Sequence, residues 1–120
     1  MHRTTIGSIG HDRPKRAVTI TEIRTVVEEV LYRGYAIGIG QRLVEGVWPA
    51  AAISLLAFTL AHYKWQAGHL IGVFAAGAVL TLLFILSQSL LVCIFAHAIV
   101  DGVAFLLMPM FFKRRGQALV

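Results

Sequence analysis

The sequence predicts an all-α fold, a polytopic membrane bundle of about four transmembrane helices. Hydrophobic residues make up 58% of the 120 residues, and the mean hydropathy is +0.75. A chain this short and this apolar cannot hide its apolar surface in one small water-soluble core. The runs 47–61 and 70–86 contain no Asp, Glu, Lys or Arg, as is typical of membrane spans. We therefore expect the lipid bilayer to surround the chain.

Four helices are expected in chain order. The first covers about residues 18–39 and carries several charges, each costing about 2.5 to 3.5 kcal/mol at the centre of a span. Other helices must therefore shield it. The second covers 48–65, with Pro49 in its first turn, a position that suits proline. The third covers 68–86 and the fourth 90–108, so all four fit one membrane-embedded domain.

That domain is expected at residues 18–112, between a polar basic tail at 1–17 and a basic tail at 113–120. Four spans place both termini on one side, together with the connection that holds Lys64. The positive-inside rule makes this side cytoplasmic. Compact loops and the lack of an organelle signal favour a prokaryotic plasma membrane, and the N-terminal segment lacks the apolar core of a signal peptide.

The basic charge and the single cysteine exclude other classes. A net charge of +5 could suggest nucleic acid, but the basic residues lie at the ends of spans and not across a folded face, so no nucleic-acid partner is expected. Cys93 alone can form neither an internal disulfide nor a multi-cysteine zinc site. Small residues recur every four positions at Gly68, Gly72 and Ala76, which predicts a face for close helix packing.

The first helix separates its polar residues into faces. Glu29 and Arg33 are four apart with the acid first, so we interpret them as a structural ion pair. Glu28 has only Arg24 as a candidate partner and is the freer carboxylate. Glu28 shares a polar stripe with four further residues, which are Thr21, Thr25, Tyr32 and Tyr35.

Further ionisable residues fall at membrane depth on the second and fourth helices. At 1.5 Å per residue, Glu28, His62, His97 and Asp101 lie roughly 9 to 22 Å from the cytoplasmic edge. A single membrane histidine is often just a hydrogen-bonding residue between helices. Placing an ionisable side chain in a membrane costs free energy, so four such residues at a shared depth indicate a functional site.

These residues form three ordered motifs, which are Glu28-Glu29-Val-Leu-Tyr-Arg33, Phe58-Thr-Leu-Ala-His62 and His97-Ala-Ile-Val-Asp101. Their order and spacing resemble those of the type II CAAX prenyl endopeptidases and their bacterial relatives, the CAAX protease and bacteriocin-processing (abortive infection) membrane proteins. The resemblance covers roughly residues 18–110.

The resemblance implies an intramembrane endopeptidase with its active site inside the bundle. In such an enzyme the catalytic residues Glu28 and His62 would activate a water, while His97 and Asp101 would steady the oxyanion. Three residues would support them, which are Glu29, Arg33 and Phe58. The implied substrate is a peptide or a membrane protein.

Asp101 departs from the commonest pattern, because many members have asparagine at this position. An ionised aspartate would repel an oxyanion, so it must be protonated or serve another role. Metal binding is one such role, and zinc held by Glu28, His62, His97 and Asp101 is the alternative to a site without a metal or other cofactor. We expect the metal-free site.

Members usually carry further spans before the first motif, which leaves other readings of the function open. One is an inactive, truncated member. Another is a non-catalytic immunity protein of the bacteriocin self-immunity type, which binds a bacteriocin or a partner membrane protein. The charges of the first helix and the small-residue face also make a homo-oligomer or a partner subunit reasonable.

Overall fold

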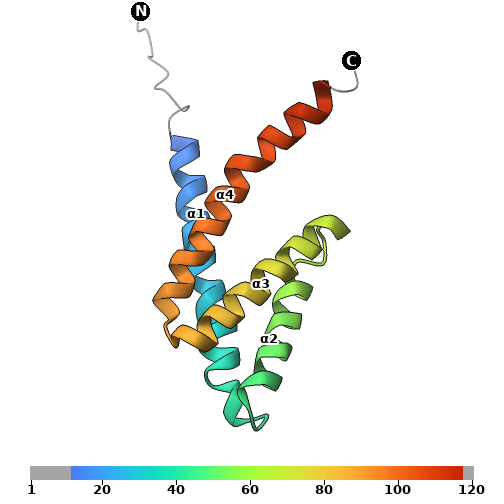
Figure 1. The fold of residues 1–120 in the computed structure, drawn as a ribbon. Helices are drawn as coiled ribbons and strands as arrows, with labels where there is room; N and C mark the ends of the chain where they lie inside the picture. Colours follow the sequence, from blue (N-terminus) through green and yellow to red (C-terminus); the bar gives the residue numbers. More distant parts are fainter. Residues whose placement is uncertain (1–11, 118–120) are drawn as a thin grey trace, which may run out of the picture.

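The computed structural model describes residues 12–117, and this part of the chain contains helices and turns but no strand. The four main helices are α1 (Asp12–Glu29), α2 (Val47–Ala61), α3 (Ala67–Ser87) and α4 (Leu90–Gln117) (Figure 1). The predicted all-α fold with four helices is therefore confirmed. Residues 1–11 and 118–120 lie outside the described residues, so the boundaries of the expected tails stay a prediction.

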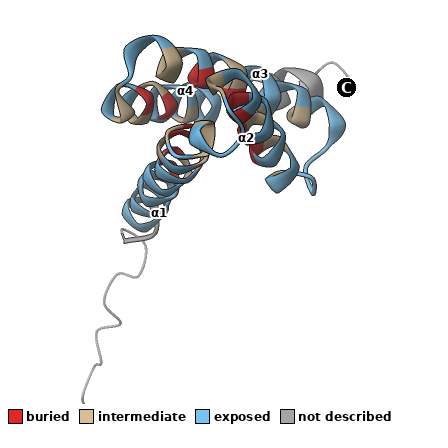
Figure 2. Ribbon diagram, turned by 90° about the horizontal axis from the view of Figure 1, so that it is seen from below, coloured by how far each residue is buried: buried red, intermediate tan, exposed pale blue. Residues whose placement is uncertain are grey.

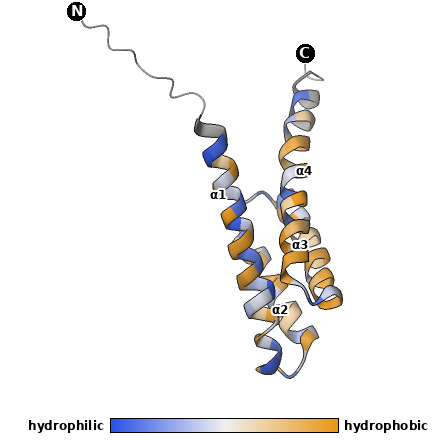
Figure 3. Cartoon of the chain, turned by 90° about the vertical axis from the view of Figure 1, so that its left-hand side faces the viewer, coloured by the Kyte–Doolittle hydropathy of each residue, from blue (hydrophilic) through white to orange (hydrophobic). Residues whose placement is uncertain are grey.

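Two helices are long and apolar enough to cross a membrane, namely α3 and the Leu90–Met110 part of α4. Only 17% and 11% of their apolar windows are buried by the rest of the chain, whereas the core helix of a soluble protein is mostly buried. α2 is a shorter apolar helix. Figure 3 shows hydrophobic residues along α3 and α4, and more hydrophilic residues on α1.

The first predicted helix is longer and less regular than expected. It begins at Asp12, ends as an α-helix at Glu29, and continues as a π-helix, η1 (Val30–Ile37), and a short 3₁₀ turn, η2 (Gly40–Arg42). In this wider coil the Gly38 N–H donates to the carbonyl of residue 33, five positions earlier. Such segments are rare and often lie at functional sites. Here η1 directly follows the glutamate pair of the first motif.

Two predicted helix ends were wrong. α2 ends at Ala61, and His62 lies in the turn that follows it. The sequence predicted a helix to residue 65 because its apolar pattern, with Trp65 as an anchor at the end, gives no signal for this turn. α4 continues to Gln117 with Pro109 inside it, although proline removes one helical hydrogen bond and usually ends or bends a helix.

α1 and α4 run antiparallel, and α2 and α3 form a helical hairpin beside them (Figure 1). α1 begins and α4 ends at the same end of the molecule. Buried residues gather where η1, α2, α3 and the first half of α4 meet (Figure 2). The core contains as many polar as hydrophobic residues, namely Thr25, Glu29, Arg33, Ser54, Thr81 and His97 beside Ile37, Ala50, Ala51, Phe58, Leu80 and Cys93.

The close helix contact is at Gly77 of α3. A Cβ at this position would lie 2.9 Å from both Leu55 Cδ1 and Phe58 Cδ1 of α2. No helix of the described chain covers the predicted packing face at Gly68 and Gly72, because a Cβ at either would meet nothing within 4 Å. The spacing of small residues locates a face on one helix, but the way the neighbouring helices cross decides which part of it is covered.

Candidate functional site

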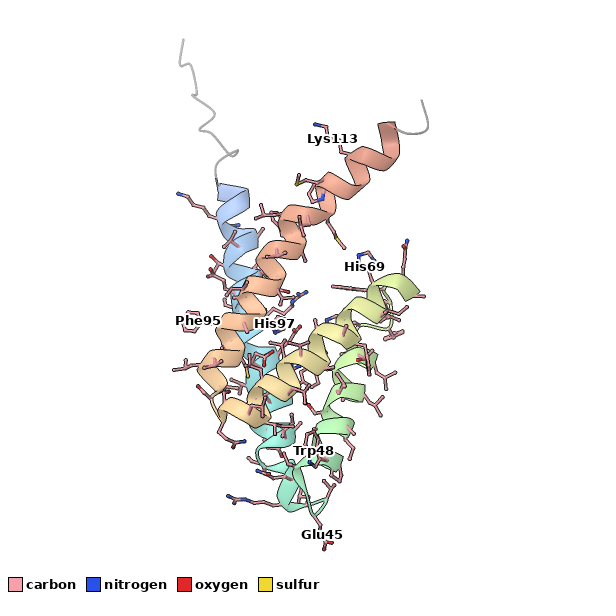
Figure 4. The ribbon with its side chains drawn as sticks, in the orientation of Figure 1. Glu45, Trp48, His69, Phe95, His97 and Lys113 are labelled. Atoms are coloured by element: carbon pink, nitrogen blue, oxygen red, sulfur yellow. The ribbon has the colours of Figure 1, made fainter. Side chains whose placement is uncertain are left out.

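The imidazole of His97 lies at the centre of a cluster of three carboxyl groups. Its Nδ1 is 2.6 Å from Glu29 Oε1. Its Nε2 is 3.7 Å from Glu28 Oε2 and 3.6 Å from Asp101 Oδ1. His97 is 5% exposed and points between the helices, whereas Phe95, two residues earlier on α4, points outward (Figure 4). Residues far apart in the sequence thus meet at one ring.

Glu29 and Arg33 form the ion pair that the sequence predicts. Arg33 Nη1 donates to Glu29 Oε1 at 3.0 Å, and the two residues are 1% and 0% exposed. The guanidinium also donates through Nη2 to the Gly77 carbonyl at 3.0 Å and lies 4.8 Å from the centre of the Phe58 ring. Arg33 therefore connects η1 with α2 and α3, and Glu29 connects α1 with α4.

Glu28 is the freer carboxyl, as predicted. Its side chain is 15% exposed, and its Oε1 lies 3.4 Å from Nε of Arg24. Arg24 is itself 46% exposed, so solvent weakens this ion pair. Within the described residues, Glu28 Oε2 is buried and has no hydrogen-bond partner. A buried oxygen in this state calls for a donor such as a water molecule.

Asp101 contacts two residues that the sequence analysis did not assign to the site. Thr25 Oγ1 lies 2.9 Å from Asp101 Oδ2, and Arg24 Nη2 lies 3.9 Å from the same oxygen. The sequence contained a partial signal, because Thr25 shares the polar stripe of Glu28. Only the antiparallel pairing of α1 with α4 shows that this stripe faces Asp101.

His62 lies apart from the cluster. Its ring is 5.0 Å from the Phe58 ring, which is in turn 6.2 Å from the ring of His97. Among the described residues, no salt bridge joins His62 to a carboxylate. Its Nδ1 lies 2.8 Å from the Phe58 carbonyl. Because a carbonyl only accepts, Nδ1 is the donor, and the neutral form of the ring then has its lone pair on Nε2.

The structure therefore brings together three of the four predicted catalytic residues, Glu28, His97 and Asp101. Family comparison agrees with the motifs that supplied them. The model of a family described as type II CAAX prenyl endopeptidase Rce1-like matches residues 16–103, which include all three motifs. The chain belongs to this family. No curated protein and no solved structure matches it.

Membership in the type II CAAX prenyl endopeptidase family makes this chain a membrane protein of a protease family. It confirms the resemblance found in the sequence. Tetrahedral zinc needs several free donors around one point. Of the four residues of the zinc alternative, Glu28, His97 and Asp101 lie together, whereas His62 contacts the Phe58 ring and forms no salt bridge with a described carboxylate. In the part of the chain that the structure describes, no three His, Cys, Asp or Glu side chains are grouped to hold a metal ion.

Proposed function

We propose that this chain is an intramembrane endopeptidase that hydrolyses a peptide bond with a water activated by Glu28 and His62. The observation that carries the proposal is the buried Oε2 atom of Glu28. It has no hydrogen-bond partner among the described residues, and it lies 3.7 Å from Nε2 of His97. A carboxylate oxygen in this position can accept a proton from a water bound between the side chains of Glu28 and His97.

His62 acts in this proposal as a second base. Its support is the free lone pair on Nε2, which the hydrogen bond of Nδ1 to the Phe58 carbonyl leaves available. The Phe58 ring packs against both His62 and His97. Hydrogen bonds of catalytic groups are often long in a free enzyme and shorten when substrate binds. We propose that substrate brings His62 and Glu28 to the same water.

His97 and Asp101 are proposed to stabilise the oxyanion. Glu29 fixes the His97 ring, because the carboxylate accepts a hydrogen bond from Nδ1 and so orients Nε2 toward Glu28 and Asp101. Such prepositioned donors lower the energy of a developing negative charge. To donate through Nε2, His97 must carry a hydrogen on both ring nitrogens, because Nδ1 already donates to Glu29. Asp101 must be protonated as well, since an ionised carboxylate would repel the oxyanion. The proposed site uses no metal.

The proposed substrate is a peptide or a membrane-protein segment presented near the cytoplasmic side. We propose a prokaryotic plasma membrane with both termini cytoplasmic, which the basic residues of the sequence favour. The start of α1 and the end of α4 lie at the same end of the molecule (Figure 1), as this topology requires.

The test is cleavage of a candidate peptide by the chain in membranes. Glu28→Gln and His62→Ala should each lower the cleavage rate by about 10²-fold to 10⁴-fold, because each removes a base. Glu22→Gln is the matched control, because Glu22 is an exposed glutamate of the same helix. Wild-type cleavage that survives in both site variants would refute the mechanism.

A second candidate is a non-catalytic immunity or interaction protein that binds a partner helix. The open surface at Gly72 of α3 favours it, because a Cβ there meets nothing within 4 Å and small residues let helices approach closely. This candidate predicts that the phenotype tolerates Glu28→Gln but not Gly72→Leu. The endopeptidase predicts the reverse.

A further inference from the structure

Thr25 differs from the other threonines of α1. Thr19 and Thr21 are exposed, and each donates to the carbonyl four residues earlier in its own helix. Thr25 makes the same local contact, 3.0 Å to the Thr21 carbonyl, but it is 2% exposed and its Oγ1 also lies 2.9 Å from Asp101 Oδ2 on α4. Its hydroxyl therefore joins two helices.

This contact repeats the geometry of the Glu29 and His97 contact one turn away. Thr25 and Glu29 are four apart on α1, and His97 and Asp101 are four apart on α4. Because the helices run antiparallel, Glu29 meets His97 and Thr25 meets Asp101. The two contacts are about 6 Å apart along the helix axis. One contact would let the helices pivot, and two fix their relative rotation.

The Thr25 and Asp101 contact also closes the end of the α1 and α4 interface. Residues 15–24 are all exposed, so Thr25 is the first buried residue of α1 among the described side chains. Residues 102–110 are all exposed, so Asp101 is the last residue of α4 before the helix separates from α1. Within residues 15–24 and 102–110, no buried side chain lies beyond this pair to hold the carboxyl in place.

No other described side chain lies within hydrogen-bond distance of the Asp101 carboxyl. Arg24 lies 3.9 Å away and is 46% exposed, and His97 Nε2 lies 3.6 Å away. Both distances exceed that of a hydrogen bond. Thr25 therefore fixes Oδ2, and this leaves Oδ1 facing the imidazole of His97.

The Thr25 contact holds whether or not Asp101 carries a proton. The hydroxyl of Thr25 has one hydrogen and can also accept, whereas the Thr21 carbonyl only accepts. If Asp101 is ionised, the hydroxyl hydrogen is shared between the two acceptors. If Asp101 is protonated on Oδ1, as donation to an oxyanion requires, Oδ2 is its carbonyl oxygen and still accepts from the Thr25 hydroxyl. The same two oxygen atoms stay in contact in both cases.

We propose that Thr25 is a positioning residue that holds the Asp101 carboxyl across the α1 and α4 interface and so keeps Oδ1 beside His97. Its role in catalysis rests on the proposed function. Thr25→Val keeps the size and branching of the side chain but removes the hydroxyl, whereas Thr25→Ser keeps the hydroxyl. Thr21→Val is the matched control, because Thr21 makes the same local bond and does not contact Asp101.

The experiment measures peptide cleavage and an infrared spectrum for each variant in membranes. The difference spectrum between wild type and Asp101→Asn identifies the carboxyl band of Asp101. Thr25→Val should lower kcat about 10-fold to 100-fold, the scale of a small misplacement of a catalytic group, with KM unchanged, and should shift this band. Thr25→Ser and Thr21→Val should keep the wild-type kcat and the wild-type band.

A band that Thr25→Val leaves in place would overturn the inference, as would a fall in kcat that Thr25→Ser does not rescue. Absence of any Glu28-dependent cleavage by wild type would instead refute the proposed function. In that case the band alone decides whether Thr25 holds Asp101: a shift supports the contact and no shift refutes it.

Discussion

Nδ1 of His97 lies 2.6 Å from Oε1 of Glu29, although 68 positions separate the two residues in the sequence. The same Glu29 oxygen accepts a hydrogen bond from Arg33 at 3.0 Å. Glu29 is thus the point at which the ion pair of the first helix meets the third motif. The predictions below follow from this buried network and from the residues around it.

Arg33→Met should destabilise the fold strongly. It leaves the Glu29 carboxylate buried without its cation, and removal of one partner of a buried ion pair costs about 3 to 5 kcal/mol. The free energy of unfolding in detergent, from denaturant titration, measures the loss. Combining Arg33→Met with Glu29→Gln should cost less than the sum of the two single changes. Additive losses would show that the pair is not coupled.

Gly77→Ala should destabilise the packing of α2 on α3. The added methyl group would lie 2.9 Å from side-chain atoms of Leu55 and Phe58, and overpacking of this kind costs about 1 to 3 kcal/mol. Gly72→Ala is the control on the same helix, because its methyl group meets nothing within 4 Å. Alanine there should keep or raise stability, since it favours a helix more than glycine. Equal losses in the unfolding midpoint for both variants would contradict the Gly77 contact.

His62→Ala should reduce cleavage without unfolding the chain. His62 is partly exposed in the turn after α2, and the only described hydrogen bond of its side chain is to the carbonyl of Phe58 in the helix that precedes it. Loss of a general base lowers a rate by about 10²-fold to 10⁴-fold. His69→Ala is the matched control. The rings of His62 and His69 both pack against Trp65, but His69 lies on α3. A comparable loss of kcat in both variants, or a lowered unfolding midpoint in His62→Ala, would point to a structural role.

Chelator treatment should leave cleavage unchanged, because the proposed water is activated by side chains. Cleavage rates before and after dialysis against a chelator, together with elemental analysis of the active protein, check this. One tightly held zinc per chain, with activity lost to chelator and restored by zinc, would establish the zinc alternative.

Local features were predictable from the sequence. The apolar runs that became α2 and α3 and the ion pair of Glu29 and Arg33 depend on spacing along a single helix, which the sequence shows directly. The greater freedom of Glu28 followed from the same spacing. The three motifs predicted the family over roughly residues 18–110, and the family model matches residues 16–103.

Relations between helices were less predictable. Depth along the helix axis placed Glu28, His62, His97 and Asp101 in one slab, but it does not fix lateral distance. Among the described residues, His97 contacts the carboxyl groups, whereas His62 contacts the Phe58 ring. The rotation of α4 against α1 determines that His97 contacts Glu29 most closely. The π-helix after Glu29 has no clear signal in the apolar pattern, because it changes hydrogen-bond spacing and not composition.

Among the described residues, the buried core contains as many polar or charged residues as hydrophobic ones, including Thr25, Glu29, Arg33 and His97. Lipid is as apolar as the side chains of other helices, so the hydrophobic effect does not drive inserted spans together. Hydrogen bonds between helices therefore add to van der Waals packing in holding the helices of such a bundle together. The contacts that assemble the helices would then also form the reactive centre. A variant that loses these contacts should leave helices that are inserted in the membrane but not associated with one another.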